Sequence, residues 1–487
     1  MKKSRIALIA LVCIGIFLLV YFPHFNYKYP LHVDEWYHIS ETLKLKNDNY
    51  VVTGGTFRIG FDLFLLPLSY IFDLVKIYQY FPAIWAVLTA LVLFWVVNKK
   101  SGNFYLALLS MIFFASLKSN VNLQGLWFFI PSVFVFPFIF FYVYLFAEGV
   151  ERQNKKYILW SLGLMLIVLL VHSVSLFFAL PFLFVYSLFN YKYILKEWKF
   201  FSSFLLIPLA GIIFYSLVRD IGIFESLSKI FYELQFPYGR MPLELNNSFY
   251  EVYSPVGYLL ACLGIFFLIY LKKSKYLVYL LWPLLTLFSI LLFKMFGVSF
   301  FAPYQRTMYY FAISLPILSA FGVYYLLKVK DKYIRKENWK KWVGFIIIAV
   351  ILILTFYSYN NIPAGVQVYH LIEDNDYDSL LFLKNYSIGR VMAPLDISMA
   401  SYAIAGEPSV GALYFYGIKK KTKEFFSSNS SNNCTQQNKI LRQFNVSYVL
   451  AEKPIDCNWT LIYNKTNLIY NVKNISNPVK KPVQKSF

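Results

Sequence analysis

Long apolar runs separated by short polar segments occupy most of the first 357 residues of the chain. A helix needs about 20 apolar residues to cross a bilayer, and most of the runs approach or reach this length. We therefore predict about eleven transmembrane helices, at residues 6–22, 81–97, 104–117, 126–147, 157–171, 174–189, 200–218, 256–271, 276–293, 307–327 and 343–357.

The stretch 157–189 is divided into two crossings. As a single helix it would be roughly 50 Å long, whereas the apolar core of a bilayer is about 30 Å thick. Lys155 and Lys156 precede the stretch and Lys192 follows it, so both of its ends are expected in the cytoplasm. We predict a hairpin that turns near His172 on the outer side.

The N-terminal run fixes the orientation of the later ones. Lys2, Lys3 and Arg5 precede the run at 6–22, and no small-residue cleavage site follows it. This is typical of a retained signal anchor whose N-terminus is cytoplasmic, so residues 23–80 are expected outside. The next apolar segment, 61–72, is only about 12 residues long and too short to cross. We predict that it lies on the outer surface as an interfacial helix.

Two distributions of residues support this topology. Up to residue 357, Lys and Arg are concentrated in the segments assigned to the cytoplasm although the outer loops are longer, as the positive-inside rule requires. A crossing at 61–72 would invert the later topology and place every Asn-x-Ser/Thr sequon in the cytoplasm, where such sites are not glycosylated. In the predicted topology all the sequons lie outside; they begin at Asn246, Asn385, Asn429, Asn433, Asn445, Asn458, Asn464 and Asn474.

Composition agrees with an integral membrane protein. Hydrophobic residues make up 59% of the chain, aromatic residues 21% and charged residues only 15%, which is far more apolar than a soluble domain. The net charge of +21 does not indicate nucleic acid, because the cations are spread in small clusters between apolar runs and do not form one basic face. The expected surroundings are membrane lipids.

The composition changes near residue 358. Residues 358–477 contain strand patterns in GRVMAPLD and VSYVLAE and a helix pattern at 377–386, which predicts a small extracytoplasmic α/β domain. Residues 478–487 form a basic tail that we expect to be disordered. The chain is thus divided into a transmembrane domain at 1–357, whose first outer loop spans 23–80, an outer domain and a tail.

Two of the four cysteines can pair. Cys13 and Cys262 fall inside apolar runs, which leaves Cys434 and Cys457 as the pair that can form a disulfide. The sequence does not decide whether they do.

The strongest candidate for chemistry is the polar stretch PLHVDEWYH at 30–38, directly after the first span. It contains Asp34 and Glu35, and His38 follows one helical turn later. If the segment is helical, these side chains can form an acid–base cluster. In the alternative interpretation Asp34 only caps a helix that runs to about Leu45.

The predicted spans contain no Asp, Glu, Lys or Arg. Pumps and ion-coupled transporters usually carry ionisable groups along their path, so this class is disfavoured. Polar groups collect in the outer loops at 23–80, 219–255 and 294–306. An enzyme that transfers a sugar from a lipid phosphate needs a base for the acceptor proton and a cation for the phosphate, and these loops can supply both.

Three outer residues are candidates for binding the lipid phosphate. Arg306, in FFAPYQRTMYYF, lies where the chain re-enters the membrane, at headgroup depth, although an interfacial Arg can also serve only to anchor its helix. Arg58, in TGGTFRIG, has the same alternative beside the segment 61–72. His172 can face the same cavity from its hairpin, or it can be a turn residue without a function.

No metal site is predicted. The acidic run EDNDYD at 373–378 lacks the Gly and Glu of an EF-hand and is better explained as a solvated helix start. The Cys and His residues do not show the spacing of a zinc site. A divalent metal stays possible but is not supported, and no obligatory cofactor is expected.

The whole arrangement resembles the GT-C glycosyltransferases. The features that carry the resemblance are the N-terminal anchor, the DE pair in HVDEWYH, the interfacial segment with Pro67, the many spans and the C-terminal outer α/β domain. The chain is most similar to the protein O-mannosyltransferases, the aminoarabinose transferase and their archaeal and bacterial relatives. The resemblance implies inverting transfer from a dolichyl- or undecaprenyl-phosphate sugar with Asp34 as general base. The oligosaccharyltransferase motif WWDYG is absent from the sequence, so transfer of a whole glycan to asparagine is not expected.

The predicted function is therefore transfer of a sugar from a polyprenyl-phosphate donor to a protein, lipid or glycan acceptor on the outer face of a cell membrane. Three alternatives remain open. The first is a polymerase or ligase of lipid-linked glycans. The second is a non-enzymatic scaffold whose outer domain binds glycans or proteins. The third is a lipid-glycan flippase, which the uncharged spans disfavour.

Overall fold

The computed structural model describes residues 3–48, 59–120, 124–203, 221–237, 248–271, 274–333, 337–357, 370–386, 389–410, 416–427 and 434–474, together with residues 209, 212, 213, 216 and 359. The chain forms two compact units. Unit 1 contains Met1–Pro23 and Phe81–Gln367, and unit 2 contains His24–Tyr80 and Val368–Phe487. The first outer loop therefore belongs to the same unit as the C-terminal segment.

Unit 1 is helical. Within the described residues of the whole chain, six helical segments are long and apolar enough to cross a membrane, namely Lys3–His24, Leu74–Ser101, Pro131–Glu151, Lys155–His172, Ser274–Phe296 and Tyr304–Asp331. The first two extend into unit 2 at His24 and at residues 74–80. Shorter apolar helices lie at Phe104–Ala115, Val174–Phe189, Pro255–Tyr270 and Lys341–Tyr357. These lengths confirm a polytopic α-helical membrane protein. The predicted crossing at 200–218 lies largely outside the described residues.

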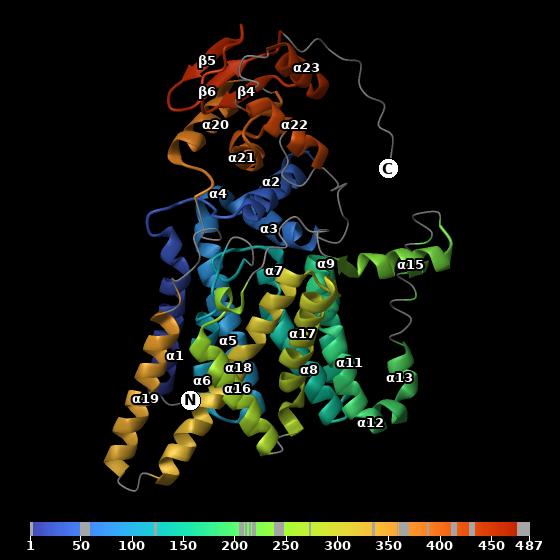
Figure 1. Ribbon diagram of the computed structural model, residues 1–487, viewed down its shortest axis with the longest axis vertical. Helices are drawn as coiled ribbons and strands as arrows, with labels where there is room; N and C mark the ends of the chain where they lie inside the picture. The colour runs from blue at the N-terminus through green and yellow to red at the C-terminus, as the bar shows by residue number, and fades with distance from the viewer. Residues whose placement is uncertain are drawn as a thin grey trace. The chain divides into compact units, whose positions relative to one another are not determined.

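The helices of unit 1 appear in this order along the chain: α1 (Lys3–Tyr21), α5 (Phe81–Ser101), α6 (Phe104–Ala115), α7 (Pro131–Phe134), α8 (Phe136–Glu151), α9 (Lys155–His172), α10 (Val174–Phe177), α11 (Leu180–Phe189), α12 (Tyr191–Lys196), α13 (Trp198–Ser203), α15 (Ile223–Glu233), α16 (Pro255–Tyr270), α17 (Leu277–Phe296), α18 (Tyr304–Tyr333) and α19 (Glu337–Tyr357). They are labelled in Figure 1 where there is room. The apolar stretch 157–189 is interrupted where α9 ends, at His172. Strands β1 (Gln235–Pro237) and β2 (Val298–Phe300) pair antiparallel.

Polar side chains set where several of these helices begin. The side chains of Asn103, Asn154 and Ser254 accept hydrogen bonds from backbone N–H groups in the first turns of α6, α9 and α16. Such N-caps satisfy donors that the helix itself leaves unpaired. In α16 the cap is followed by Pro255, a residue favoured at the first helical position.

Helices α16 and α18 lie side by side (Figure 1) and approach closely through glycine. A Cβ on Gly264 of α16 would lie 2.0 Å from the Leu318 carbonyl oxygen, and a Cβ on Gly322 of α18 would lie 2.1 Å from the Leu260 carbonyl oxygen. Only glycine permits this backbone approach, which is a common way of packing helices in lipid.

Unit 2 combines a four-stranded sheet with helices. The strand order is β3–β4–β6–β5, with β3 (Val391–Met392) parallel to β4 (Tyr448–Ala451), whereas β6 (Leu468–Asn471) is antiparallel to both β4 and β5 (Thr460–Asn464). Figure 1 shows this sheet with its neighbouring helices. The helices of unit 2 are α2 (Val33–Asp48), α3 (Ile59–Ile71), α4 (Leu74–Ile77), α20 (Asp374–Tyr386), α21 (Leu395–Ala405), α22 (Tyr416–Phe426) and α23 (Cys434–Phe444).

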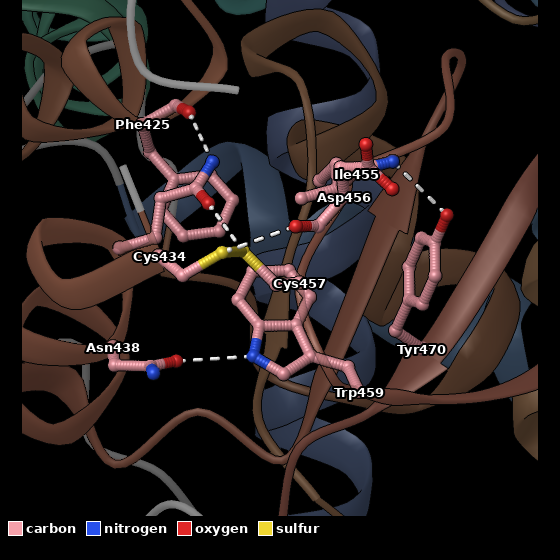
Figure 2. The surroundings of a disulfide bond; sticks show 9 residues. Phe425, Cys434, Asn438, Ile455, Asp456, Cys457, Trp459 and Tyr470 are labelled. Atoms are coloured by element: carbon pink, nitrogen blue, oxygen red, sulfur yellow. Dashed lines mark hydrogen bonds between the residues drawn. A yellow bond between two sulfur atoms is a disulfide. The ribbon is translucent and has the colours of Figure 1, made fainter. Parts of the chain in front are cut away.

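A disulfide joins Cys434 to Cys457, and so links the start of α23 to the segment before β5. Figure 2 shows Trp459 beside it, with its indole N–H donating to the Asn438 side chain at 3.0 Å. The Trp459 ring stacks on Phe425 and contacts Tyr470 edge-on. The cross-link therefore borders the core between α22, α23 and the sheet. Disulfides persist in oxidising compartments, which agrees with the predicted outer location.

The first outer loop packs against the C-terminal part of unit 2. The Tyr27 hydroxyl donates to the Ile372 carbonyl at 2.8 Å, and its ring stacks on His370 at 3.9 Å. The Ser40 hydroxyl on α2 donates to the Met399 carbonyl on α21 at 3.0 Å. The loop that carries the acidic pair is thus held by residues more than three hundred positions away in the chain.

Candidate functional site

Glu35 organises the segment that leads into α2. Its side chain is 1% exposed, and Oε2 accepts hydrogen bonds from the backbone N–H groups of Leu31 at 2.8 Å and His32 at 2.9 Å. A glutamate in the first turn that reaches back to N–H groups before the helix is one half of a capping box. At the level of sequence, helix capping was an interpretation of Asp34, whereas in the structure Glu35 makes these contacts with the backbone N–H groups.

Asp34 has a different environment. Its side chain is 23% exposed, and Oδ2 lies 3.7 Å from Nδ1 of His32. The backbone N–H of Asp34 also donates to this ring nitrogen, at 3.1 Å. Asp34 lies in the first turn of α2, where the N-terminal end of the helix carries partial positive charge. Of the two acids, Asp34 is the one that keeps contact with solvent.

His38 is buried beside a third acid. Its Nδ1 lies 2.8 Å from Oδ1 of Asp62 on α3, and both side chains are almost fully buried. Phe61 contacts the imidazole ring edge-on. Among the described residues, the hydrogen-bond partner of the ring is therefore Asp62, whereas the sequence suggested Asp34 or Glu35. A buried carboxylate on one ring nitrogen fixes the orientation and tautomer of a histidine.

The three acids share a neighbour. Tyr78 is fully buried, and the negative charges of Glu35, Asp62 and Asp34 all act on its hydroxyl. Asp34, Glu35, His38, Asp62 and Tyr78 thus form one cluster, which we call the acidic cluster. In the sequence, Asp62 falls within the apolar segment 61–72 and was given no role. The signal that could have identified it is an acidic residue within the apolar helix IGFDLF.

In unit 1, two of the predicted phosphate ligands lie near one tyrosine. The Ser175 hydroxyl is 2.7 Å from Nδ1 of His172 and 2.7 Å from the Tyr310 hydroxyl. Arg306 lies one turn before Tyr310 on α18, and its positive charge acts on the Tyr310 hydroxyl. We call His172, Ser175, Tyr310 and Arg306 the tyrosine cluster. It connects the end of α9 with the start of α18.

A second cation in unit 1 was not selected from the sequence. Lys118 follows α6 and is 1% exposed, with its Nζ 3.7 Å from the centre of the Tyr250 ring. Its backbone N–H donates to the Val252 carbonyl at 3.0 Å. Burial lowers the pKa of Lys118 to about 8, whereas the negative charge of Glu251 acts to raise it. A lysine that ends an apolar run is easily taken for an interfacial anchor, and its burial becomes visible only in three dimensions.

The remaining candidates from the sequence are Arg58 and the acidic run at 373–378. Arg58 lies outside the described residues. The acidic run at 373–378 starts α20, where the Asp376 carboxylate accepts the Glu373 N–H at 2.9 Å, which is one half of a capping box. Asp374 pairs with Lys28 at 2.8 Å. In the described part of the chain, no group of three or more His, Cys, Asp or Glu residues is arranged to hold a metal ion.

Comparisons with known proteins place this arrangement in a known fold. No family model matches the sequence, and no curated protein matches it. Solved structures do match. The oligosaccharyltransferase of Archaeoglobus fulgidus, in its apo form, aligns with a TM-score of 0.62 and 12% identity over 93% of this chain and 70% of that chain.

Two further structures give the same picture. The Archaeoglobus fulgidus oligosaccharyltransferase AglB, in complex with an inhibitory peptide and a dolichol-phosphate, aligns with a TM-score of 0.61 and 12% identity over 93% of this chain and 69% of that chain. ArnT from Cupriavidus metallidurans, in the apo state, aligns with a TM-score of 0.55 and 11% identity over 96% of this chain and 99% of that chain. The chain therefore shares the fold of these oligosaccharyltransferase and ArnT structures, and the predicted fold is confirmed.

Proposed function

We propose that the protein is a GT-C membrane glycosyltransferase that transfers a sugar from a polyprenyl-phosphate donor to an acceptor on the extracytoplasmic face. The observation that carries the proposal is the pairing of this fold with an acidic cluster in which Glu35 is occupied by two backbone N–H groups while Asp34 remains accessible. One acid of the pair therefore holds the loop, and the other keeps part of its carboxylate exposed to solvent.

Asp34 is assigned as the general base. Its carboxylate takes the proton from an acceptor hydroxyl or amine as that group attacks the anomeric carbon of the donor sugar. A new glycosidic bond forms while the bond between the anomeric carbon and the phosphate oxygen breaks, and the bonding pair leaves with the polyprenyl phosphate. Attack opposite to the leaving group inverts the anomeric configuration. The phosphate leaves readily, so no strong acid is needed.

Glu35 and His38 are assigned positioning roles. Glu35 keeps the residues before α2 in place and so fixes the backbone that carries Asp34. His38 is oriented by Asp62 through the 2.8 Å contact. Because both side chains are buried, the His38–Asp62 pair holds α2 against α3. The contact through Nδ1 also fixes the direction in which Nε2, the other ring nitrogen of His38, points.

The tyrosine cluster is assigned to the donor phosphate. Arg306 stands at the first turn of an apolar helix, where the guanidinium group can reach a lipid phosphate at headgroup depth. Negative charge grows on this phosphate as the sugar leaves, and a cation already in place stabilises the transition state. His172 can add a hydrogen bond. The roles assigned to the acidic cluster rest on contacts within unit 2, and those assigned to Arg306 and His172 rest on contacts within unit 1.

The proposal includes the topology derived from the sequence, with a cytoplasmic N-terminus and an extracytoplasmic C-terminal segment. The disulfide between Cys434 and Cys457 supports it, since cytosolic proteins rarely keep such bonds. The exposed apolar face of α3, with Leu63 50%, Tyr70 65% and Ile71 70% exposed, supports an interfacial position for this helix.

The test uses the purified full chain in detergent or nanodiscs. It is incubated with a panel of dolichyl- and undecaprenyl-phosphate sugars and with peptide, lipid and glycan acceptors, and the release of polyprenyl phosphate is measured together with the glycosylated product. We expect release from at least one donor, dependent on an acceptor. A folded protein that turns over no donor in the panel but binds glycans or proteins through unit 2 would favour the scaffold alternative.

A further inference from the structure

A cavity of about 570 Å³ lies in unit 1 between α5, α8 and α9. It is formed where α5 and α8 end and α9 begins, which is the cytoplasmic end of these helices in the proposed topology. None of the residues of the acidic cluster, the tyrosine cluster or the surroundings of Lys118 lines it. The cavity therefore has no role in the reaction proposed above.

The walls of the cavity are aromatic. Trp95 of α5 contacts the rings of Phe141 and Tyr144 of α8 edge-on, at 5.2 and 5.3 Å. Trp160 of α9 forms another wall and is 71% exposed. Exposed tryptophans and tyrosines near the end of a membrane helix are typical of the lipid headgroup boundary. An apolar wall of this kind accepts acyl chains or the glycerol region of a lipid.

The charged residues that line the cavity in the described part of the chain are both cations, Lys99 and Arg152. Lys99 is exposed. The neighbouring acids Glu148 and Glu151 do not line the cavity, and both pair with Lys100, at 2.8 and 2.6 Å. Arg152 shares Glu148 with Lys100 through its Nε and remains 62% exposed. The cavity is therefore apolar inside and positive at its rim.

We propose that this cavity binds an anionic glycerophospholipid, with Lys99 and Arg152 at the phosphate and the aromatic wall around the upper acyl chains. Basic pockets between transmembrane helices on the cytoplasmic side recognise anionic headgroups. A free phosphate would leave most of the volume empty and would gain nothing from the tryptophans. A zwitterionic lipid would bring its own cation to a rim that is already positive. Charge and shape together favour a lipid with net negative charge.

The bound lipid would brace three helices at once. Lys99 is on α5, Arg152 directly follows α8, and Trp160 is on α9. A molecule that contacts all three and binds only the folded protein stabilises it by mass action. This role is independent of the proposed transfer reaction, because a protein of another function with the same spans would keep the site.

The test measures lipid retention and unfolding temperature of the delipidated full chain. Dioleoyl phosphatidylglycerol, dioleoyl phosphatidylcholine and inorganic phosphate are added separately, and bound lipid is counted by native mass spectrometry. We expect phosphatidylglycerol to bind and to raise the unfolding temperature, with phosphatidylcholine weaker and phosphate without effect. Lys99→Gln should weaken phosphatidylglycerol binding about fivefold, and Lys99→Gln with Arg152→Gln about 30-fold.

The matched control is Lys192→Gln with Lys196→Gln. These exposed lysines lie on α12 at the same predicted membrane face and do not line the cavity. Removing them changes the net charge equally and should leave phosphatidylglycerol binding unchanged. Equal losses in both double variants would overturn the proposal in favour of diffuse attraction. Equal stabilisation by phosphatidylcholine, or by phosphate, would also overturn it. The single variant Lys99→Gln keeps the test interpretable if the double variant fails to fold. Because Lys99 has no ion-pair partner in the described residues, its replacement should not disturb the folded protein.

Discussion

The acidic cluster in unit 2 and the tyrosine cluster in unit 1 are built in opposite ways. The acidic cluster is assembled from residues close in sequence, with 24 positions between His38 and Asp62, and a buried glutamate fixes its backbone. The tyrosine cluster joins helices 135 positions apart, from Ser175 to Tyr310, through hydroxyl and imidazole contacts. The first region is built to hold a carboxylate near solvent. The second is built to hold a cation at the end of a membrane helix.

This difference predicts different consequences of mutation. Changes in the acidic cluster should separate into effects on chemistry and effects on folding, according to which acid is changed. Changes in the tyrosine cluster should affect donor use first, because its cation is assigned to the phosphate. Variants of Arg306 and Asp62 test this division, and variants of Lys118 and Asp374 test two charged contacts outside both clusters, with expected effects that decrease in this order.

Arg306→Gln should lower kcat/KM about 10²- to 10³-fold, because the developing charge on the phosphate loses its cation. The measurement is the rate of polyprenyl phosphate release over a range of donor concentrations. Lys294→Gln is the matched control, since Lys294 is an exposed cation of the preceding predicted outer loop and should retain nearly full activity. If the two variants had the same activity, the assignment of the phosphate to the tyrosine cluster would be wrong.

Asp62→Asn should lower the transfer rate about 10- to 100-fold, the range typical of residues that orient another catalytic group. The His38 ring would lose the carboxylate that fixes it, while Asp34 would keep its place. The comparison with Asp73→Asn, a half-exposed acid that caps the short helix α4, controls for the loss of one negative charge. Equal rates in wild type and Asp62→Asn would limit the buried pair to a structural role.

The pH dependence of unfolding should report on Lys118. Burial lowers its pKa to about 8 in the folded protein, whereas an unfolded lysine titrates near 10.4. Because the folded state disfavours the protonated form, the contribution of Lys118 to stability is lowest below pH 8 and rises as the pH increases toward about 10. Lys118→Met should flatten this part of the profile in a thermal unfolding series.

A profile that is the same in wild type and in Lys118→Met would contradict this assignment. A second readout is available in the presence of polyprenyl phosphate. If the lipid phosphate binds near Lys118, its charge would raise the pKa of the lysine and shift the rise in stability to higher pH.

Asp374→Asn should have the smallest effect. Lys28, followed by the hydrogen bond from Tyr29, lowers the pKa of Asp374. A carboxyl group whose pKa is lowered in the folded state stabilises it above its unfolded pKa, and this contribution is lost as the pH falls. The pair is largely exposed, so we expect a slightly lower unfolding temperature at pH 7 and no difference near pH 2. A large loss at pH 7 would show that this contact has a greater role in holding the first outer loop.

The sequence predicted the parts of the fold that depend on local pattern. Apolar runs predicted the helices. Asp34 was selected as a candidate because the DE pair directly after the first run can be recognised in the sequence without knowledge of the three-dimensional contacts. The two predicted strand patterns and the helix pattern in the C-terminal segment correspond to β3, β4 and α20. Capping by Glu35 was not predicted, because either acid of the pair is compatible with a helix start.

Contacts between distant segments could not be read from local pattern. The His38 partner was missed because Asp62 lies in an apolar run, where a buried ion pair and a surface charge look alike. The close packing of first-loop residues such as Tyr27 on the C-terminal segment carries no periodic signal. The burial of Lys118 depends on Tyr250 and Glu251, which belong to another loop. The contacts of His172 and Ser175 with Tyr310, one turn from Arg306, join segments that are far apart in the chain.

The most direct test of the account is a paired measurement on Asp34→Asn and Glu35→Gln, in which the transfer rate and the unfolding temperature are determined for both proteins. We predict that Asp34→Asn lowers the rate about 10²- to 10⁴-fold and changes the unfolding free energy by less than about 1 kcal/mol. We predict that Glu35→Gln costs about 1–2 kcal/mol of unfolding free energy, because a neutral amide oxygen is a weaker acceptor for the two N–H groups. An Asp34→Asn protein that transfers sugar at the wild-type rate would contradict the central claim.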